Sequence, residues 1–111
     1  MGTNKRYPNL GPQLAEEREL REARKRGPLQ SLTSDQLRLA TQVLSIAPER
    51  PPTWGRAWLR FGDTDVRCTV RIMRWTSAAV GVSVDVDGEE LRCWVWQGAV
   101  DGLAAREDAW R

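Results

Sequence analysis

The sequence predicts an α+β protein, in which an N-terminal helical arm precedes a small antiparallel β-barrel of four to five strands. From Trp54 onward apolar residues recur with a period of two, and turn residues recur every eight to twelve positions. Before Trp54 the chain is rich in charged residues and strong helix formers. The pair Asp87-Gly88 is the preferred sequence for a two-residue hairpin loop. Together these observations place helix first and antiparallel strands second.

The 111 residues have room for one compact domain. Because the first third is polar and charged, the packed part has about 50 to 60 residues, near the lower limit for a core without disulfide or metal. We expect four parts: a mobile arm with a charged helix over residues 1–30, a short helix and proline-rich linker over 31–52, the β-barrel over 53–103, and a C-terminal tail over 104–111.

The N-terminal arm divides into two segments. Residues 1–12 contain two glycines and two prolines with almost nothing apolar, which is typical of extended chain. Residues 13–26 are strong helix formers with Glu/Arg pairs at i,i+4 spacing, and Gly27-Pro28 follows as a stop. The apolar face of this helix has only two leucines and two alanines, so we expect it to be solvated or to await a partner.

Residues 32–46 open with Thr33 and Gln36 in capping-box spacing. Leu37, Ala40 and Leu44 then fall on one helical face, which favours a short helix. The alternation of apolar and polar residues over 37–43 also permits a strand, and so short a run leaves both open. The segment "APERPP", residues 47–52, is typical of a stiff linker.

We expect strands over residues 54–61, 66–74, 79–86 and 90–96. The Asp87-Gly88 loop aligns the last two, pairing Val84 with Leu91, Val82 with Cys93 and Val80 with Val95, all apolar. On the opposite face Trp94 lies across from Gly81 and Trp96 across from Ala79, so large rings cover small partners.

The other two connections follow from matching faces. A loop of three or five residues at "TSA" keeps the apolar sets of its two strands on one side of the sheet. A four-residue "GDTD" loop pairs Phe61 with Val66 and Leu59 with Cys68. On the outer face that register sets Arg60 opposite Arg67, Arg56 opposite Arg71, Trp58 opposite Thr69 and Trp54 opposite Met73.

The end of the chain, "WVWQGAVDGL", predicts a strand, a 3₁₀ turn over residues 96–99 and a short closing strand over 100–103. This ending resembles that of an SH3-like barrel, and the resemblance of pattern covers Thr53 to Leu103. It implies the fold and no particular ligand. The tyrosine-rich segment of peptide-binding SH3 domains is absent, so polyproline recognition is not implied.

Composition argues against several classes of function. The chain has no histidine, and Cys68 and Cys93 form no CxxC motif, so we expect neither a metal site nor a cofactor. The predicted register places the two cysteines on one face, two strands or about 9.6 Å apart, too far for a disulfide. Glycines are scattered rather than grouped as phosphate-binding loops, and both lysines lie in the first 30 residues. We therefore do not expect an enzyme.

Composition also suggests where the protein works. No apolar run is long enough for a membrane span, so we expect a cytoplasmic protein. The 15 arginines against 2 lysines resemble the composition of proteins from GC-rich bacteria. The net charge of +2 hides a segregation: residues 54–75 carry five arginines and two acids, whereas residues 80–111 carry three arginines and seven acids.

The outer face carries the candidate site. Like charges directly opposite each other destabilise a sheet, so the expected arginine pairs call for compensation by nearby acids, by stacking on tryptophan or by an anionic partner. The candidate binding residues are the arginines and tryptophans of that face: Arg56, Trp58, Arg60, Arg67, Arg71, Arg92 and Trp94.

Three interpretations of this face stay open. Arginine and tryptophan side chains can simply cover a barrel too small to bury them. They can also bind nucleic acid by stacking and phosphate contacts, extended by the basic arm with Lys5 and Arg6. Alternatively they form a hot spot for a protein partner. We therefore expect a small binding protein, for nucleic acid or alternatively for protein.

Overall fold

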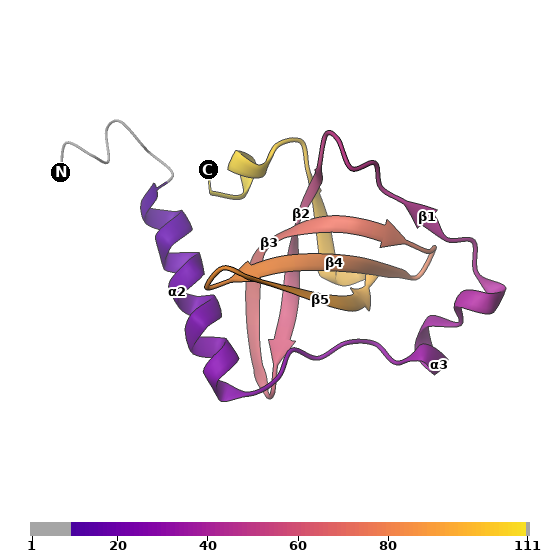
Figure 1. The fold of residues 1–111 in the computed structure, drawn as a ribbon, viewed down its shortest axis with the longest axis horizontal. Helices are drawn as coiled ribbons and strands as arrows, with labels where there is room; N and C mark the ends of the chain where they lie inside the picture. Colours follow the sequence, from indigo (N-terminus) through magenta and orange to yellow (C-terminus); the bar gives the residue numbers. More distant parts are fainter. Residues whose placement is uncertain (1–9, 111) are drawn as a thin grey trace.

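A computed structural model describes residues 10–110 and has the expected α+β class, an N-terminal helix followed by an antiparallel sheet (Figure 1). The helix α2 (Leu10–Arg26) stands beside one end of the sheet. The six strands are β1 (Ser45–Ile46), β2 (Thr53–Phe61), β3 (Thr64–Trp75), β4 (Ala79–Val86), β5 (Glu89–Trp96) and β6 (Val100–Leu103). Their order is β5-β4-β3-β2-β6, with β1 on β3.

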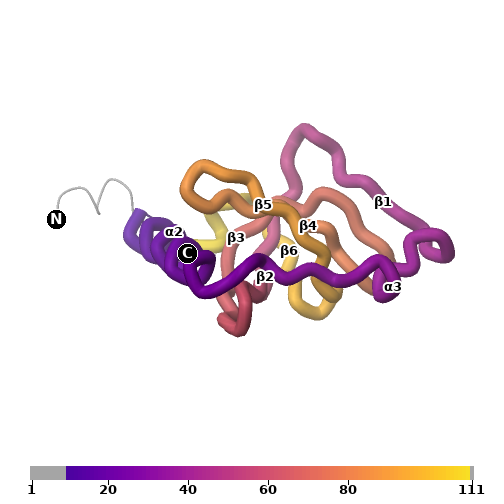
Figure 2. The backbone as a smooth tube through the Cα atoms, turned by 60° about the horizontal axis from the view of Figure 1, so that its bottom comes forward, coloured from indigo at the N-terminus to yellow at the C-terminus, as the bar shows by residue number. Residues whose placement is uncertain are grey.

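The sheet is open, so the expected closed barrel is not confirmed. Its end strands β5 and β6 do not pair with each other in the described residues. Instead, the segment that leaves α2 contacts both β2 and β5. The Gln30 N–H donates to the carbonyl of Arg60 at 2.7 Å, and the Leu32 N–H donates to the carbonyl of Trp94 at 2.9 Å. Figure 2 shows this segment crossing the strands on its way to α3 (Ser34–Leu37).

The β4–β5 hairpin confirms the predicted register at every pair, including Trp94 opposite Gly81 and Trp96 opposite Ala79. Asp87 and Gly88 both have positive φ, 54° and 80°, as a type I′ turn requires. The turn sequence and the alternation of apolar residues predict the same pairing in this hairpin, because both depend on its local register.

The predicted register between β2 and β3 is wrong by two residues. The turn has two residues, Gly62 and Asp63, rather than four, and Phe61 pairs with Thr64. The expected arginine pairs do not form: Arg60 lies opposite Asp65, and Arg67 lies opposite Trp58. In the same way Arg56 lies opposite Thr69 and Trp54 opposite Arg71. A shift of two residues keeps every side chain on its expected face, so alternation alone cannot detect it.

The shorter turn is favoured by a contact with the end of α2. Gly62 has φ 59°, as the first position of a type II′ turn requires, and its N–H donates to the carbonyl of Pro28 at 2.9 Å. A Cβ added at Gly27 would stand 2.6 Å from the Cα of Gly62. The two backbones can approach this closely because both residues lack a Cβ.

The β3–β4 connection follows the predicted pattern only in part. Residues 76–78 lie between the two strands, and Thr76 Oγ1 accepts from the N–H groups of Ala78 and Ala79. A bulge between Ile72 and Arg74 sets Trp75 opposite Val80, and beyond it the apolar residues face one another as predicted, with Ile72 opposite Val82. The 3₁₀ turn η2 (Gln97–Ala99) leads into β6 as expected, and β6 pairs with β2. A last 3₁₀ helix, η3 (Arg106–Trp110), follows. None of the helices in residues 10–110 has the length and apolar composition needed to cross a bilayer.

The helix α2 packs on the sheet, so the expectation that it is solvated is wrong. Leu20 and Ala23 are 3% and 2% exposed and belong to the hydrophobic core. Arg21 and Arg24 reach Asp87 and Glu89 at the tip of the β4–β5 hairpin. The helix begins at Leu10, earlier than predicted, and the expectation for residues 1–9 lies outside the described part of the chain. Its narrow apolar face is buried through Leu20 and Ala23, and two exposed ion pairs extend the contact.

Residues 32–46 form neither the expected short helix throughout nor the alternative strand. The capping box between Thr33 and Gln36 is present. However, Arg38 takes a left-handed conformation with φ 50°, which ends α3 after one turn. The 3₁₀ turn η1 (Leu39–Thr41) follows, and Val43 and Ile46 are 86% and 70% exposed. Since these side chains do not reach the core, packing does not extend the helix.

The core lies between the inner face of the sheet and α2 and is built on Phe61, Leu59 and Val70 with the valines of β4. Cys68 and Cys93 are buried and free, with β4 between their strands, which confirms the prediction for both. Burial raises the pKa of the Cys93 thiol to about 11. Burial and the Glu16 carboxylate also raise the pKa of Cys68. Neither thiol is therefore ionised at neutral pH.

Replacing Leu20 with alanine should lower the free energy of unfolding by about 2–4 kcal/mol, because it leaves a cavity between α2 and the sheet. Leu14, on the same helix and 47% exposed, provides the matched control, and Leu14→Ala should change stability by less than about 0.5 kcal/mol. Urea denaturation followed by circular dichroism measures both. Equal effects of the two substitutions would show that α2 does not pack as described.

Candidate functional site

The seven predicted site residues lie on β2, β3 and β5, and the structure divides them into three groups. Arg60, Arg67 and Arg92 are exposed and paired with carboxylates. Arg56 and Arg71 are partly buried: Arg71 lines a cleft beside α2, and Arg56 lies near Glu16 of that helix. Trp58 and Trp94 line a hollow on the outer face. The basic residues Lys5 and Arg6 lie outside the described part of the chain.

Nearby carboxylates form ion pairs with three of the predicted arginines. Arg60 Nη1 is 3.3 Å from Asp65 Oδ1, directly across the β2–β3 ladder. Arg67 Nη2 is 2.8 Å from Asp101 Oδ2, on β6, and Arg92 Nε is 2.8 Å from Glu90 Oε1. Arg71 Nη2 donates to the backbone carbonyl of Glu49 at 3.1 Å. The cross-strand arginine pairs, for which compensation by acids, by stacking or by an anionic partner was expected, are therefore absent, and acids of the chain pair with three of these arginines.

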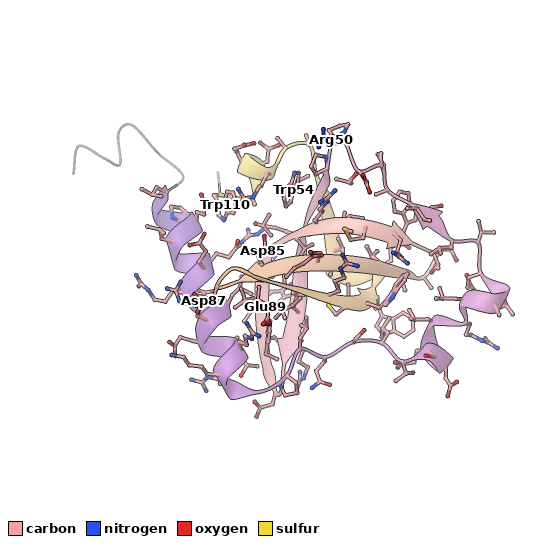
Figure 3. All side chains as sticks on the ribbon, in the orientation of Figure 1. Arg50, Trp54, Asp85, Asp87, Glu89 and Trp110 are labelled. Atoms are coloured by element: carbon pink, nitrogen blue, oxygen red, sulfur yellow. The ribbon has the colours of Figure 1, made fainter. Side chains whose placement is uncertain are left out.

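A cleft of 410 Å³ lies between α2, the sheet and η3, where Figure 3 shows Trp54, Trp110 and Asp85. Glu16 on α2 is only 9% exposed in its wall. Since β4 pairs with β3 only from Arg71 onward, the N–H of Thr69 has no strand partner there and donates to Glu16 Oε1 at 2.9 Å. The Thr69 hydroxyl lies 3.1 Å from the same oxygen. The Glu16 carboxylate thus accepts the hydrogen bond that a backbone carbonyl of a neighbouring strand would otherwise accept.

Burial raises the pKa of Glu16, although the hydrogen bonds from Thr69 and the proximity of Trp110 and Arg56 act in the opposite direction. The guanidinium of Arg106 lies between two indoles, 5.4 Å from the ring centre of Trp54 and 4.9 Å from that of Trp110. Cation–π contacts of this kind hold η3 against the cleft. The groups that line the cleft therefore bind one another. We interpret the cleft as the packing interface that joins α2 and η3 to the sheet.

The second feature is an aromatic patch formed by Trp58, Trp94 and Trp96 around a hollow of 230 Å³. Trp58 and Trp96 are 53% and 47% exposed, whereas Trp94 is partly buried over Gly81. The segment from α2 contributes Ser31 and Leu32 to the rim. Tryptophan is one of the residue types most enriched at binding hot spots.

Trp96 and Leu32 border the patch but are not among the residues predicted for the site. Trp96 could have been found, because the confirmed hairpin register places it on the same face as Trp94. Leu32 could not, because its position depends on the path of the segment from α2 to α3. Arg56 was predicted for the site but does not join the patch: its Nε is buried without a hydrogen-bond partner among residues 10–110, and its charge acts on Glu16.

The function of this chain is inferred from its own residues. Comparison with known protein families, with curated proteins and with solved structures finds no match for this chain. Among residues 10–110 no group of three or more histidine, cysteine or acidic side chains is placed to hold a metal ion. Because two of its three indoles are about half exposed, the aromatic patch is the candidate binding surface.

Arg67→Gln should lower the free energy of unfolding by up to about 1 kcal/mol, because Arg67 and Asp101 form an exposed ion pair. Asp101→Asn should have a similar effect, and the double variant should lose less than the sum of the two. Added salt should reduce the difference. A gain of stability on Arg67→Gln would instead indicate the like-charge repulsion expected from the sequence.

Glu16→Gln should keep the hydrogen bonds to Thr69 while removing a buried charge, so the variant should be at least as stable as the wild type at pH 7. The pKa of Glu16 is raised above its usual 4.5. Wild type should therefore lose stability relative to the variant as the pH rises through and above this value. Denaturation of both proteins at several pH values measures this difference.

Glu16→Ala provides the contrast, because it leaves the N–H of Thr69 unpaired. It should cost about 1–3 kcal/mol at all these pH values. If Glu16→Gln were as damaging at pH 7 as Glu16→Ala, the negative charge itself would be stabilising and the interpretation of the cleft would be wrong.

Proposed function

We propose that this chain is a small cytoplasmic binding protein that contacts a protein partner through the aromatic patch. The observation that carries the proposal is the arrangement of Trp58, Trp94 and Trp96 around one hollow, with two of the three indoles about half exposed. The buried, free cysteines suit a reducing compartment. No reaction is part of the proposal.

The charges near the patch favour protein over nucleic acid. Arg60, Arg67 and Arg92 each have a carboxylate partner within 3.3 Å, so their positive charge is largely compensated where phosphates would have to bind. Binding of nucleic acid obtains most of its affinity from uncompensated positive charge. An apolar aromatic surface with a polar rim instead matches the usual composition of a protein interface.

Nucleic acid is the second candidate because the same indoles can stack on unpaired bases. The ion pairs of Arg60 and Arg67 are exposed and could exchange a carboxylate for a phosphate. The salt dependence of binding separates the two candidates. Phosphate contacts make the affinity fall steeply with salt, whereas an apolar protein interface is much less affected.

The double substitution Trp58→Ala/Trp96→Ala should abolish capture of the partner from a nuclease-treated lysate of the source cells while leaving the fold intact. Hot-spot residues of this type each contribute about 2 kcal/mol or more, so the loss should exceed a hundredfold in affinity. Affinity capture with the full chain, followed by mass spectrometry and titration of the purified partner, measures this.

Trp75→Ala provides a matched control. Trp75 is also partly exposed, at 37%, but it pairs with Val80 and lies on the opposite face of the sheet from Trp94. Capture should survive this substitution. Retention of the partner by the double variant would contradict the proposal. Binding of a fluorescent single-stranded DNA oligonucleotide with a steep salt dependence, lost in the double variant, would establish the second candidate.

A further inference from the structure

We infer that the aromatic patch is one half of a longer groove, which binds an extended peptide carrying an apolar side chain next to an acidic one. This inference rests on the proposed function and specifies the chemistry of the partner. It comes from a second hollow of 240 Å³ that shares Ser31 and Trp94 with the hollow of the aromatic patch. The ring of Trp94 therefore stands between two adjoining hollows on the same face.

The two hollows differ in chemistry. The first is lined by indoles with Leu32 and Val95. The second is lined by two arginines, Arg74 and Arg92, together with Met73 and the surface of Gly81. One end of the groove thus suits an apolar side chain and the other suits a carboxylate.

Arg74 is the side chain that gives the groove an uncompensated charge. Arg92 is already bound to Glu90, and the contacts of Glu90 with Arg92 and Ser83 lower the pKa of its carboxyl. The side chain of Arg74, by contrast, is exposed and forms no ion pair or hydrogen bond with any residue between 10 and 110. A carboxylate of the partner would form an ion pair with Arg74, as Asp65 does with Arg60 and Asp101 with Arg67.

The packing around Gly81 holds the arginine beside the aromatic ring. A Cβ at Gly81 would stand 3.0 Å from Cγ of Arg74 and 3.3 Å from ring atoms of Trp94, so both side chains pack over this glycine. The N–H of Trp94 donates to Ser31 Oγ at 2.9 Å, and its carbonyl accepts from Leu32. The centre of the groove is therefore held in place before any partner binds, which reduces the entropic cost of association.

The sizes of the hollows favour a peptide. Each is smaller than the roughly 300–1,000 Å³ of clefts that enclose small-molecule ligands. Their volumes, 230 and 240 Å³, are nearly equal, and they lie on either side of a single ring. Neighbouring side chains of an extended peptide would occupy two such hollows more readily than one compact molecule.

The test uses the full chain as bait for a random peptide library displayed on phage. Wild-type protein should select peptides with an aromatic or aliphatic residue close to aspartate or glutamate. Arg74→Glu should lose the preference for acids, and a selected acidic peptide, measured by fluorescence polarisation, should bind this variant roughly tenfold or more weakly. Arg18→Glu is the matched control, because Arg18 is exposed on α2 outside both hollows, and it should select as wild type does.

The failures of the two proposals are distinguishable. If the selected peptides depend on Trp58 and Trp96 but their acidic preference persists in Arg74→Glu, the aromatic patch stands and the inference about Arg74 is wrong. If peptides are selected without any acidic preference, the inference is likewise wrong. If no selected peptide depends on the indoles and the chain binds single-stranded DNA instead, both proposals are overturned.

Discussion

The close approach of Gly27 to Gly62 is the constraint on which the rest of the structure depends. With no Cβ on either residue, the end of α2 meets the β2–β3 turn directly, and Gly62 donates its N–H to the carbonyl of Pro28. The contact accompanies a two-residue turn, which sets the register of β2 against β3. That register places aspartate rather than arginine opposite Arg60, so a backbone contact determines which charges face one another.

The segment that links α2 to the candidate site begins at this contact. From Pro28 the chain forms backbone hydrogen bonds first with β2 and then with Trp94 on β5. It thereby covers part of an edge strand that would otherwise present unpaired backbone groups to other chains. Because Ser31 and Leu32 also border the aromatic patch, the segment that stabilises the sheet is the one that shapes the groove.

Internal ion pairs use arginines other than Arg74, which we propose as the partner-binding arginine. Arg60, Arg67 and Arg92 are bound to acids of the chain, and Arg106 lies between two indoles. Glu16 offsets the cost of its burial by serving the unpaired N–H of Thr69. A sequence with 15 arginines thus need not be a nucleic-acid binder, because three of the six arginines on the strands form ion pairs with acids of the chain.

The sequence by itself determined the α+β class, the β4–β5 hairpin with its full register, the buried cysteines and the outward position of Trp94, since alternation and turn chemistry are local properties. Only the tertiary structure decided the β2–β3 register, the packing of α2 through Leu20 and the place of Leu32 and Arg74 in the groove. Each of these depends on a contact between residues far apart in the chain: Gly27 with Gly62, α2 with β3, and Leu32 with Trp94. Hydrophobic periodicity specifies which face a side chain occupies, but not which distant segment covers it.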